Sequence, residues 1–312
     1  MAAAKGTDDE VTTAIREHGI AAASRMFGVS VRALSSRRRN IELRTGQLIH
    51  CKPYHNPPQV AYPSRLPLDV RDGVVLVGSD AHYWPETIST AHRALCYLTK
   101  ELQPKAVILN GDVFDGASIS RHPPLGWETK PTVKQELEAV TDRIHEIALA
   151  AKDAKLFWSS GNHDQRFEMK LAAQAGQFEG VHGFSLRDHF PTWQMAMSIW
   201  VNDDVVVKHR FKGGVHATHN NTVYAGRSIV TGHLHSLKVT PFSDYDGTRY
   251  GVDTGTLSNP YGPHTAYTED NPLNHRSGFA VLTFHNGRLL WPELVSVVDD
   301  SSFEFRGRVW AV

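Results

Sequence analysis

The stretch VVLVGSDAH, residues 74–82, is the part of the sequence that decides the fold. Its first four residues form a short continuous apolar run, which is typical of a strand buried in a parallel sheet. Gly78 then lets the backbone turn sharply. Asp80 and His82 follow two positions apart, so both side chains can point toward one metal ion. The stretch therefore predicts a buried strand with metal ligands at its carboxyl end.

Four further segments repeat this arrangement of polar residues behind an apolar run. They are GDVFD at 111–115, GNHD at 161–164, a lone histidine at His209, and GHLH at 232–235. In open α/β sheets, ligands bind beyond the carboxyl ends of the strands, so these side chains should meet at one edge. Carboxylate, imidazole and amide ligands without a thiolate favour manganese, iron, zinc or magnesium over copper(I). The sequence thus predicts a hydrolytic metal centre.

In this order, the five segments resemble the D-x-H, G-D-x-x-D, G-N-H-[DE], H and G-H-x-H motifs of the calcineurin-like metallophosphoesterases. The resemblance covers residues 74–236. It implies two divalent ions, with Mn²⁺ expected first and Fe, Zn or Mg as alternatives, which clamp a phosphate and activate a hydroxide. It also implies the ligands, which are Asp80, His82 and His235 for the first ion, Asp112 for both ions, and Asn162, His209 and His233 for the second ion.

The same resemblance assigns roles to residues beside the metal ligands. It implies that His163 is the general acid that contacts the phosphate and that Asp164 orients it. Asp115 corresponds to a residue that supports the ligands. The loop after Asp115 carries Arg121 and His122, which are candidates for contact with substrate phosphate, with a plain loop role as the alternative.

The lone histidine departs from the family pattern, because it usually precedes glycine and His209 precedes Arg210. His216 and His219 are rival candidates for this ligand. We favour His209 because the apolar run 205–207 places it at the end of a strand, as for every other ligand.

The N-terminal residues 10–44 have a different character from the rest of the chain. Short helical patterns at 11–17, 20–27 and 31–41 are separated by Gly19 and by a turn at 28–30, which is a helix-turn-helix pattern. Residues 30–44 hold five arginines and one acidic residue, a net charge of +4. We expect DNA contact through Arg32, Arg37, Arg38 and Arg39. The alternative is a helical dimerisation or capping module with a solvated basic face.

Strand and helix patterns alternate after this module. We expect helices at 87–102, 132–152 and 165–175, a hairpin of strands 193–201 and 205–209, and β-structure at 249–253, 279–284 and 288–298. This is an α/β fold, and the resemblance implies a four-layer αββα metallophosphoesterase sandwich preceded by a small all-helical module. The expected domains are a helix-turn-helix-like module at 1–48, a proline-rich linker at 49–70, and the metallophosphoesterase domain at 71–312.

Composition restricts the partners and the compartment. The 33 basic and 33 acidic residues balance, so any nucleic-acid surface must be local. Two cysteines do not make a disulfide framework, and no apolar stretch reaches membrane-spanning length. The N-terminus lacks the apolar core of a signal peptide. We therefore expect a cytoplasmic protein without a membrane partner.

Three functions fit these patterns. The first is a DNA-directed nuclease or phosphodiesterase, because a helix-turn-helix pattern is joined to a dinuclear site. The second is a phosphatase or phosphodiesterase that acts on nucleotides, proteins or small molecules, with the helical module used for assembly into a homo-oligomer. The third is a DNA-binding regulator with an inactive metal site, and the complete ligand set disfavours it.

Overall fold

The structure, a computed structural model, describes residues 6–47, 49, 63–122, 126 and 128–312. The chain divides into two compact units, Met1–Val60 and Ala61–Val312. Residues 50–62 of the expected linker lie outside the described residues. Among the described residues, no helix has both the length and the apolar content needed to cross a lipid bilayer.

The first unit contains two helices, α1 (Asp8–Phe27) and α2 (Val31–Thr45). Gly19 has a non-helical backbone with φ of 77°, so it divides α1 into two helical parts, as its position in the sequence predicts. Gly28 ends α1 in the left-handed conformation, and the side chain of Ser30 caps α2 by accepting a hydrogen bond from the amide of Ala33. The buried core of the unit consists of Val11, Ala14, Ile15, Ala23, Leu34, Ile41 and Ile49.

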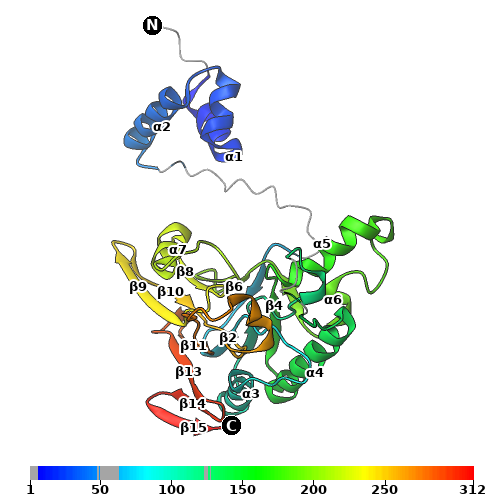
Figure 1. Cartoon of the computed structure of the whole chain (residues 1–312). Helices are drawn as coiled ribbons and strands as arrows, with labels where there is room; N and C mark the ends of the chain where they lie inside the picture. Colours follow the sequence, from blue (N-terminus) through cyan, green and yellow to red (C-terminus); the bar gives the residue numbers. More distant parts are fainter. Residues whose placement is uncertain (1–5, 48, 50–62, 123–125, 127) are drawn as a thin grey trace. The chain divides into compact units, whose positions relative to one another are not determined.

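The second unit is built on two sheets (Figure 1). The larger sheet has the order β15-β14-β13-β11-β2-β3-β4-β5, with β12 paired to β11. Its strands are β2 (Gly73–Gly78), β3 (Ala106–Leu109), β4 (Lys155–Ser159), β5 (Gln194–Ala196), β11 (Gly278–His285), β12 (Arg288–Leu289), β13 (Glu293–Asp299), β14 (Ser302–Phe305) and β15 (Arg308–Ala311).

The smaller sheet has the order β1-β6-β7-β8-β10-β9. Its strands are β1 (Leu66–Leu68), β6 (Ile199–Val201), β7 (Val205–Val207), β8 (Ser228–Thr231), β9 (Lys238–Asp244) and β10 (Gly247–Asp253). The inner faces of the two sheets meet in an apolar core, in which Val77 and Ile108 of the larger sheet join Val207 and Val230 of the smaller one. Such aligned sheets bury their alternating inward side chains against each other.

Helices cover the outer faces of both sheets. The larger sheet packs against α3 (Thr90–Leu102) and α4 (Val133–Ala151), and the smaller sheet packs against α7 (Ala217–Ala225). Figure 1 shows α7 on one side of the sheets and the α3–α4 pair on the other. The remaining helical segments are α5 (Asp164–Ala175), α6 (Leu186–His189), η1 (Ala117–Ile119), η2 (Gly176–Phe178) and η3 (Pro263–Thr268). The predicted four-layer αββα arrangement is therefore confirmed.

The structure differs from the sequence expectations in a few places. The single strand expected at 193–201 is two strands, because β5 pairs with β4 in the larger sheet and β6 pairs with β7 in the smaller one. Helix α3 begins at Thr90 because the side chain of Ser89 caps it. The sequence patterns do not predict α7, β9 or the β14–β15 hairpin. Strand β1, within the range 49–70, pairs in parallel with β6.

Candidate metal centre

The predicted ligands lie at the carboxyl ends of strands from both sheets. Strands β2, β3 and β4 run parallel to one another, and Asp80, Asp112 and Asn162 come on the loops directly after them. In the smaller sheet, β7 and β8 are parallel, and they are followed by His209 and by the pair His233 and His235. The backbone amide of His233 donates to Oδ2 of Asp80 at 2.8 Å, which joins the edges of the two sheets.

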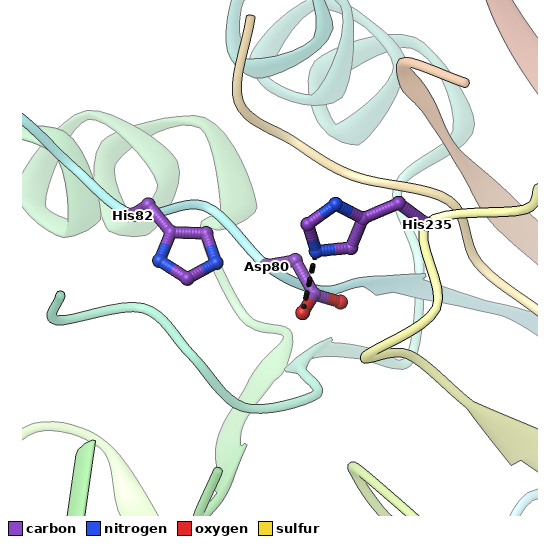
Figure 2. A group of neighbouring side chains, drawn as sticks. All are labelled: Asp80, His82 and His235. Carbon is purple, nitrogen blue, oxygen red and sulfur yellow. Dashed lines mark ion pairs between the residues drawn. The ribbon is translucent and has the colours of Figure 1, made fainter. Parts of the chain in front are cut away.

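One group of ligand atoms consists of Asp80, His82 and His235. One atom from each side chain lies within 4.8 Å of the others. Nε2 of His235 lies 3.0 Å from Oδ1 of Asp80. Figure 2 shows the carboxylate of Asp80 between the two imidazole rings. All three side chains are buried, so the group is shielded from bulk water.

A second group consists of Asp112, His209 and His233, again with ligand atoms within 4.8 Å of one another. Nε2 of His209 lies 3.1 Å from Oδ2 of Asp112 and 3.9 Å from Oδ1 of Asp80. His209 therefore stands between the carboxylates of the two groups. Its Nδ1 lies 2.8 Å from the carbonyl oxygen of Asn110, which leaves Nε2 facing the carboxylates.

The rival histidines lie elsewhere. His216 and His219 are both exposed, at the start of α7 and within it, and the ring of His219 contacts Phe242. His209 is buried. The structure thus brings His209, and neither rival, to the two carboxylates.

Several polar atoms of the site are buried without a hydrogen-bond partner among the described residues. They include Oδ1 of Asp80, Oδ1 of Asn162 and Nε2 of His209. Oδ1 of Asp80 and Nε2 of His209 are close enough to His235 and Asp112 for ion pairs, but not at an angle that makes a hydrogen bond. Buried polar atoms are nearly always hydrogen-bonded, so a cluster of unsatisfied ones marks a place where another group belongs. Oxygen and imidazole donors at this spacing fit a divalent cation.

The backbone at the candidate ligands is strained. The φ angles are 53° at Asp80, 41° at His82, 52° at Asp112, 71° at His233 and 54° at His235. Residues with a side chain rarely adopt this left-handed conformation, and it is concentrated at functional sites. The surrounding sheet edges hold these residues in place despite that cost.

Glycines lie where a larger residue would collide with the ligands. A Cβ atom at Gly161 would lie 2.1 Å from Oδ1 of Asp112, and one at Gly232 would lie 2.5 Å from Oδ2 of Asp80. At Gly111 it would lie 2.5 Å from the ring of His209. The glycines of the three motifs are therefore required by close approach to the ligands.

Asp164 does not have the role expected from the sequence. Its carboxylate accepts hydrogen bonds from four backbone amides and from the indole nitrogen of Trp158, and the amides belong to Asp112, Val113, Phe114 and Gly161. Both of its oxygens are thus used to shape the ligand loops, and the ring of His163 is held by a different carboxylate. The predicted orientation of His163 by Asp164 is wrong.

Asp115 is the residue that contacts His163. Its Oδ1 lies 2.7 Å from Nδ1 of His163 and 2.8 Å from Nδ1 of His82. Arg166 donates to the carbonyl oxygen of Asp115 at 2.8 Å, and its Nη2 lies 3.1 Å from Nε2 of His163. The side chain of His163 is partly exposed, so it faces the space in front of the ligands.

The electrostatics of the site couple carboxylates to histidines. Burial alone would raise the pKa of Asp80, but His235 and His209 outweigh it and lower this pKa to about 2. Burial would likewise lower the pKa of His209, yet Asp112 and Asp80 raise it to about 10. The histidines thus act as the counter-charges of the carboxylates, a position that a metal cation can take over.

Three further residues lie beside the ligands, and the sequence analysis assigns a ligand role to none of them. His264, in η3, stacks on His82 with ring centroids 5.3 Å apart, and its Nε2 is buried without a hydrogen-bond partner among the described residues. Nδ1 of His275 lies 3.2 Å from Nδ1 of His235. Asp253 accepts from the amides of Ser236 and Gly255, which holds the loop that carries His235. None of the three belongs to a short motif.

The two loop candidates for phosphate contact lie at the surface. Arg121 and His122 are exposed after η1, and the backbone amide of His122 bonds to Ser120. Among the described contacts, neither residue touches the ligand groups.

A further cluster, formed by His92, Cys96 and Glu146 between α3 and α4, is satisfied by its own hydrogen bonds, and burial raises the pKa of the Cys96 thiol to about 12.

Residues 73–301 match the family model of the calcineurin-like phosphoesterases. The chain belongs to this family. The match covers all the predicted ligands, and members of the family typically bind two divalent metal ions. The protein is therefore a phosphoesterase with a candidate metal site. A search of curated proteins finds no match.

Solved structures of low sequence identity align with most of the chain. A single mutant of Vps29 from Entamoeba histolytica is 14% identical, covers 77% of this chain and 97% of its own, and has a TM-score of 0.39. The phosphoesterase Yfce from E. coli is 16% identical, with coverages of 70% and 97% and a TM-score of 0.32. A protein serine/threonine phosphatase from Saccharomyces cerevisiae is 14% identical, with coverages of 76% and 85% and a TM-score of 0.36.

Proposed function

We propose that this protein hydrolyses phosphodiester bonds in DNA at a dinuclear metal site. The observation that carries the proposal is the pair of ligand groups, linked by His209, whose Nε2 faces the carboxylates of both Asp80 and Asp112. Two adjacent groups of oxygen and imidazole donors suit two cations, and a pair of divalent cations binds and activates phosphate esters.

In this proposal, Asp80, His82 and His235 hold one ion, and Asn162, His209 and His233 hold the other. Asp112 would contribute to both sites, because its carboxylate lies in one group with His209 and His233 and in another with His82. The unsatisfied buried atoms of Asp80, Asn162 and His209 support these assignments. When bound, the ions supply Lewis-acid activation of the phosphoryl group and of water. Donors without a thiolate favour Mn²⁺, with Fe, Zn or Mg as alternatives.

His163 holds the proton that the leaving oxygen needs. Asp115 contacts its Nδ1, so Nε2 is the atom that can donate to a substrate oxygen. Nη2 of Arg166 lies 3.1 Å from that nitrogen, and a guanidinium can only donate, so Arg166 has to turn to the phosphate before Nε2 can carry the proton. Asp115 also contacts His82, so it positions a ligand and the proton donor together.

The N-terminal unit supplies the DNA contact in this proposal. Arg32 and Arg39 are exposed on α2, as a phosphate contact requires. Arg37 instead lies 2.8 Å from Asp8 of α1, and Arg38 lies 3.4 Å from Glu42. Of the four arginines predicted from the sequence, Arg32 and Arg39 are therefore the better candidates, because Arg37 contributes to the packing of α1 against α2.

The test compares substrates and then removes the exposed arginines. With Mn²⁺, the protein should hydrolyse bis-p-nitrophenyl phosphate faster than p-nitrophenyl phosphate, and it should cleave DNA. The double variant Arg32→Ala/Arg39→Ala should bind DNA more weakly, with a shallower dependence on salt, while Arg16→Ala/Arg25→Ala in α1 serves as a control of equal charge. A preference for the monoester, with unchanged DNA binding in the double variant, would favour the alternative of a phosphatase with an assembly module.

A further inference from the structure

Cationic and aromatic side chains gather on the smaller sheet next to the metal centre. We define the basic strip as Arg65, Trp200, Lys208, Arg210, Phe211, Lys212, Tyr224 and Arg227. Lys208 and Arg210 flank His209 in the chain, and the other members lie in or beside β1, β6, β8 and α7. Nothing in the proposed hydrolytic chemistry requires these residues.

Four of the five cations of the strip lie over aromatic rings. The guanidinium of Arg65 is 4.3 Å from the ring centroid of Trp200, and that of Arg227 is 5.7 Å from it. Nζ of Lys212 lies 3.8 Å from the ring of Tyr224. Lys208 lies 5.1 Å from the ring of Phe211. The rings are accessible, with 67% of Tyr224 and 45% of Phe211 exposed.

Four of the five positive charges of the strip take part in no ion pair recorded among the described residues. Among the ion pairs of the described residues, none involves Lys208, Arg210, Lys212 or Arg227. Cations without acidic partners repel one another in the free protein, and an anionic ligand would relieve that repulsion.

The strip is connected to the metal centre. Arg210 follows the ligand candidate His209 in the chain and is exposed. His233, the exposed ligand candidate, lies in the same ligand group as His209. A chain of phosphates that crosses the strip would therefore arrive at the exposed side of the candidate ligands.

We propose that the basic strip binds single-stranded nucleic acid and guides its backbone to the metal centre. The guiding step rests on the proposed function, whereas binding does not. Uncompensated cations attract phosphates, and exposed rings beside them stack on unpaired bases. The bases of duplex DNA are already stacked on one another, and an acidic peptide has no bases. Neither ligand would therefore use both the cations and the exposed aromatic rings of the strip.

Binding is measured by fluorescence anisotropy of a labelled oligothymidylate on the full-length protein in EDTA, so that no hydrolysis occurs. Lys212→Gln/Arg227→Gln removes two exposed cations and should raise Kd about tenfold at moderate salt. It should also reduce the slope of log K against log salt by about 0.7 for each phosphate that the protein no longer neutralises. Tyr224→Leu should raise Kd roughly fivefold or more without changing that slope, because it removes stacking and no charge.

The matched control is Arg71→Gln/Lys134→Gln, which removes the same charge from exposed positions outside the strip. It should leave Kd within about twofold of the wild type. The strip variants should also lose more affinity for the single strand than for a duplex of equal length. The proposal is overturned if the strip variants bind oligothymidylate as tightly as the wild type. An equal loss of affinity in the control variant, or equal competition by a polyglutamate peptide, would overturn it as well.

The guiding step has a separate readout. Relative to the wild type, Lys212→Gln/Arg227→Gln should lower the ratio of kcat/KM on oligothymidylate to kcat/KM on bis-p-nitrophenyl phosphate by about tenfold. An unchanged ratio would contradict guidance. If the wild type hydrolyses neither substrate, the proposed function fails, while the binding result in EDTA still decides whether the strip holds single strands.

Discussion

Oδ1 of Asp115 lies 2.7 Å from Nδ1 of His163, and the same oxygen lies 2.8 Å from Nδ1 of His82. One buried carboxylate thus positions a candidate metal ligand and the candidate proton donor. Burial would raise the pKa of Asp115, but hydrogen bonds from His163 and His82 hold it well below the usual range. Asp115 therefore stays ionised and keeps both imidazoles in fixed orientations.

Substitutions at these two residues should have different effects. His163→Asn should lower kcat by roughly 10²–10⁴-fold and leave the metal content nearly unchanged, because it removes a proton donor and no ligand. Asp115→Asn should lower both activity and metal affinity by roughly 10–100-fold, because it also releases His82. Steady-state kinetics and elemental analysis of the purified variants measure the two effects. Loss of metal from His163→Asn would make His163 a ligand and contradict its assignment.

Gly161→Ala should abolish metal binding without changing any ligand. The added Cβ would lie 2.1 Å from Oδ1 and 2.3 Å from the backbone nitrogen of Asp112, so the loop of Asp112 must move. Gly176→Ala is the matched control, because no atom lies within 4 Å of a Cβ there. Titration calorimetry with Mn²⁺ compares the two. An Mn²⁺ affinity equal to the wild type in Gly161→Ala would show that the close approach of Gly161 to Asp112 is not needed for metal binding.

His209→Ala should lose metal affinity, whereas His216→Ala and His219→Ala should retain it. The reason is geometric, since Nε2 of His209 lies 3.1 Å from Asp112 and both rivals are exposed. The measurement is Mn²⁺ titration of all three variants under the same conditions. A loss confined to His219→Ala would mean that the lone-histidine ligand has been misassigned.

Glu136 should make the stability of the protein depend on pH. This side chain of α4 is fully buried, and its Oε1 accepts from the amide of Ala117. Burial raises its pKa from 4.5 to about 8, and the charge of Asp115 adds to the rise. Between these values the folded state keeps a proton that the unfolded state has lost. The contribution of Glu136 to stability is therefore complete below pH 4.5 and is lost as the pH rises to about 8.

Glu136→Gln keeps the hydrogen-bond acceptor for Ala117 and cannot ionise. The free energy of unfolding of this variant, relative to the wild type, should therefore increase by up to about 1.4 kcal/mol per pH unit across that window and level off above it. Urea unfolding of both proteins in EDTA, at several pH values, gives the difference. A difference that does not change with pH would contradict a raised pKa.

The sequence predicts the parts of the site that short motifs encode. Strand-end glycines and polar residues, such as Gly78 and Asp80, locate the ligands because the chain order of parallel strands brings their carboxyl ends together. The apolar runs likewise predict β2, β3 and β4. The helices of the N-terminal unit follow from local signals, namely Gly19, Gly28 and the cap at Ser30.

What the sequence does not predict depends on contacts between distant segments. His264 of η3 stacks on His82, and no local sequence pattern predicts a contact between residues so far apart in the chain. The role of Asp164 does not follow from its place next to His163, because its partners are backbone amides on another loop. The sequence pattern predicts β5 and β6 as one strand, because both are short and apolar. They are separate strands in the structure because β5 pairs with β4 in the larger sheet.

The most direct test of the central claim is metal reconstitution followed by diester hydrolysis. Protein stripped with EDTA should be inactive toward bis-p-nitrophenyl phosphate, take up two Mn²⁺ ions per chain, and regain activity in proportion to the metal bound. Asp112→Asn, treated in the same way, should stay inactive because the carboxylate of Asp112 lies with ligands of both proposed ions, His209 and His233 for one and His82 for the other. The account would be contradicted by full hydrolysis in the stripped protein, or by none after loading with Mn²⁺, Fe²⁺, Zn²⁺ or Mg²⁺.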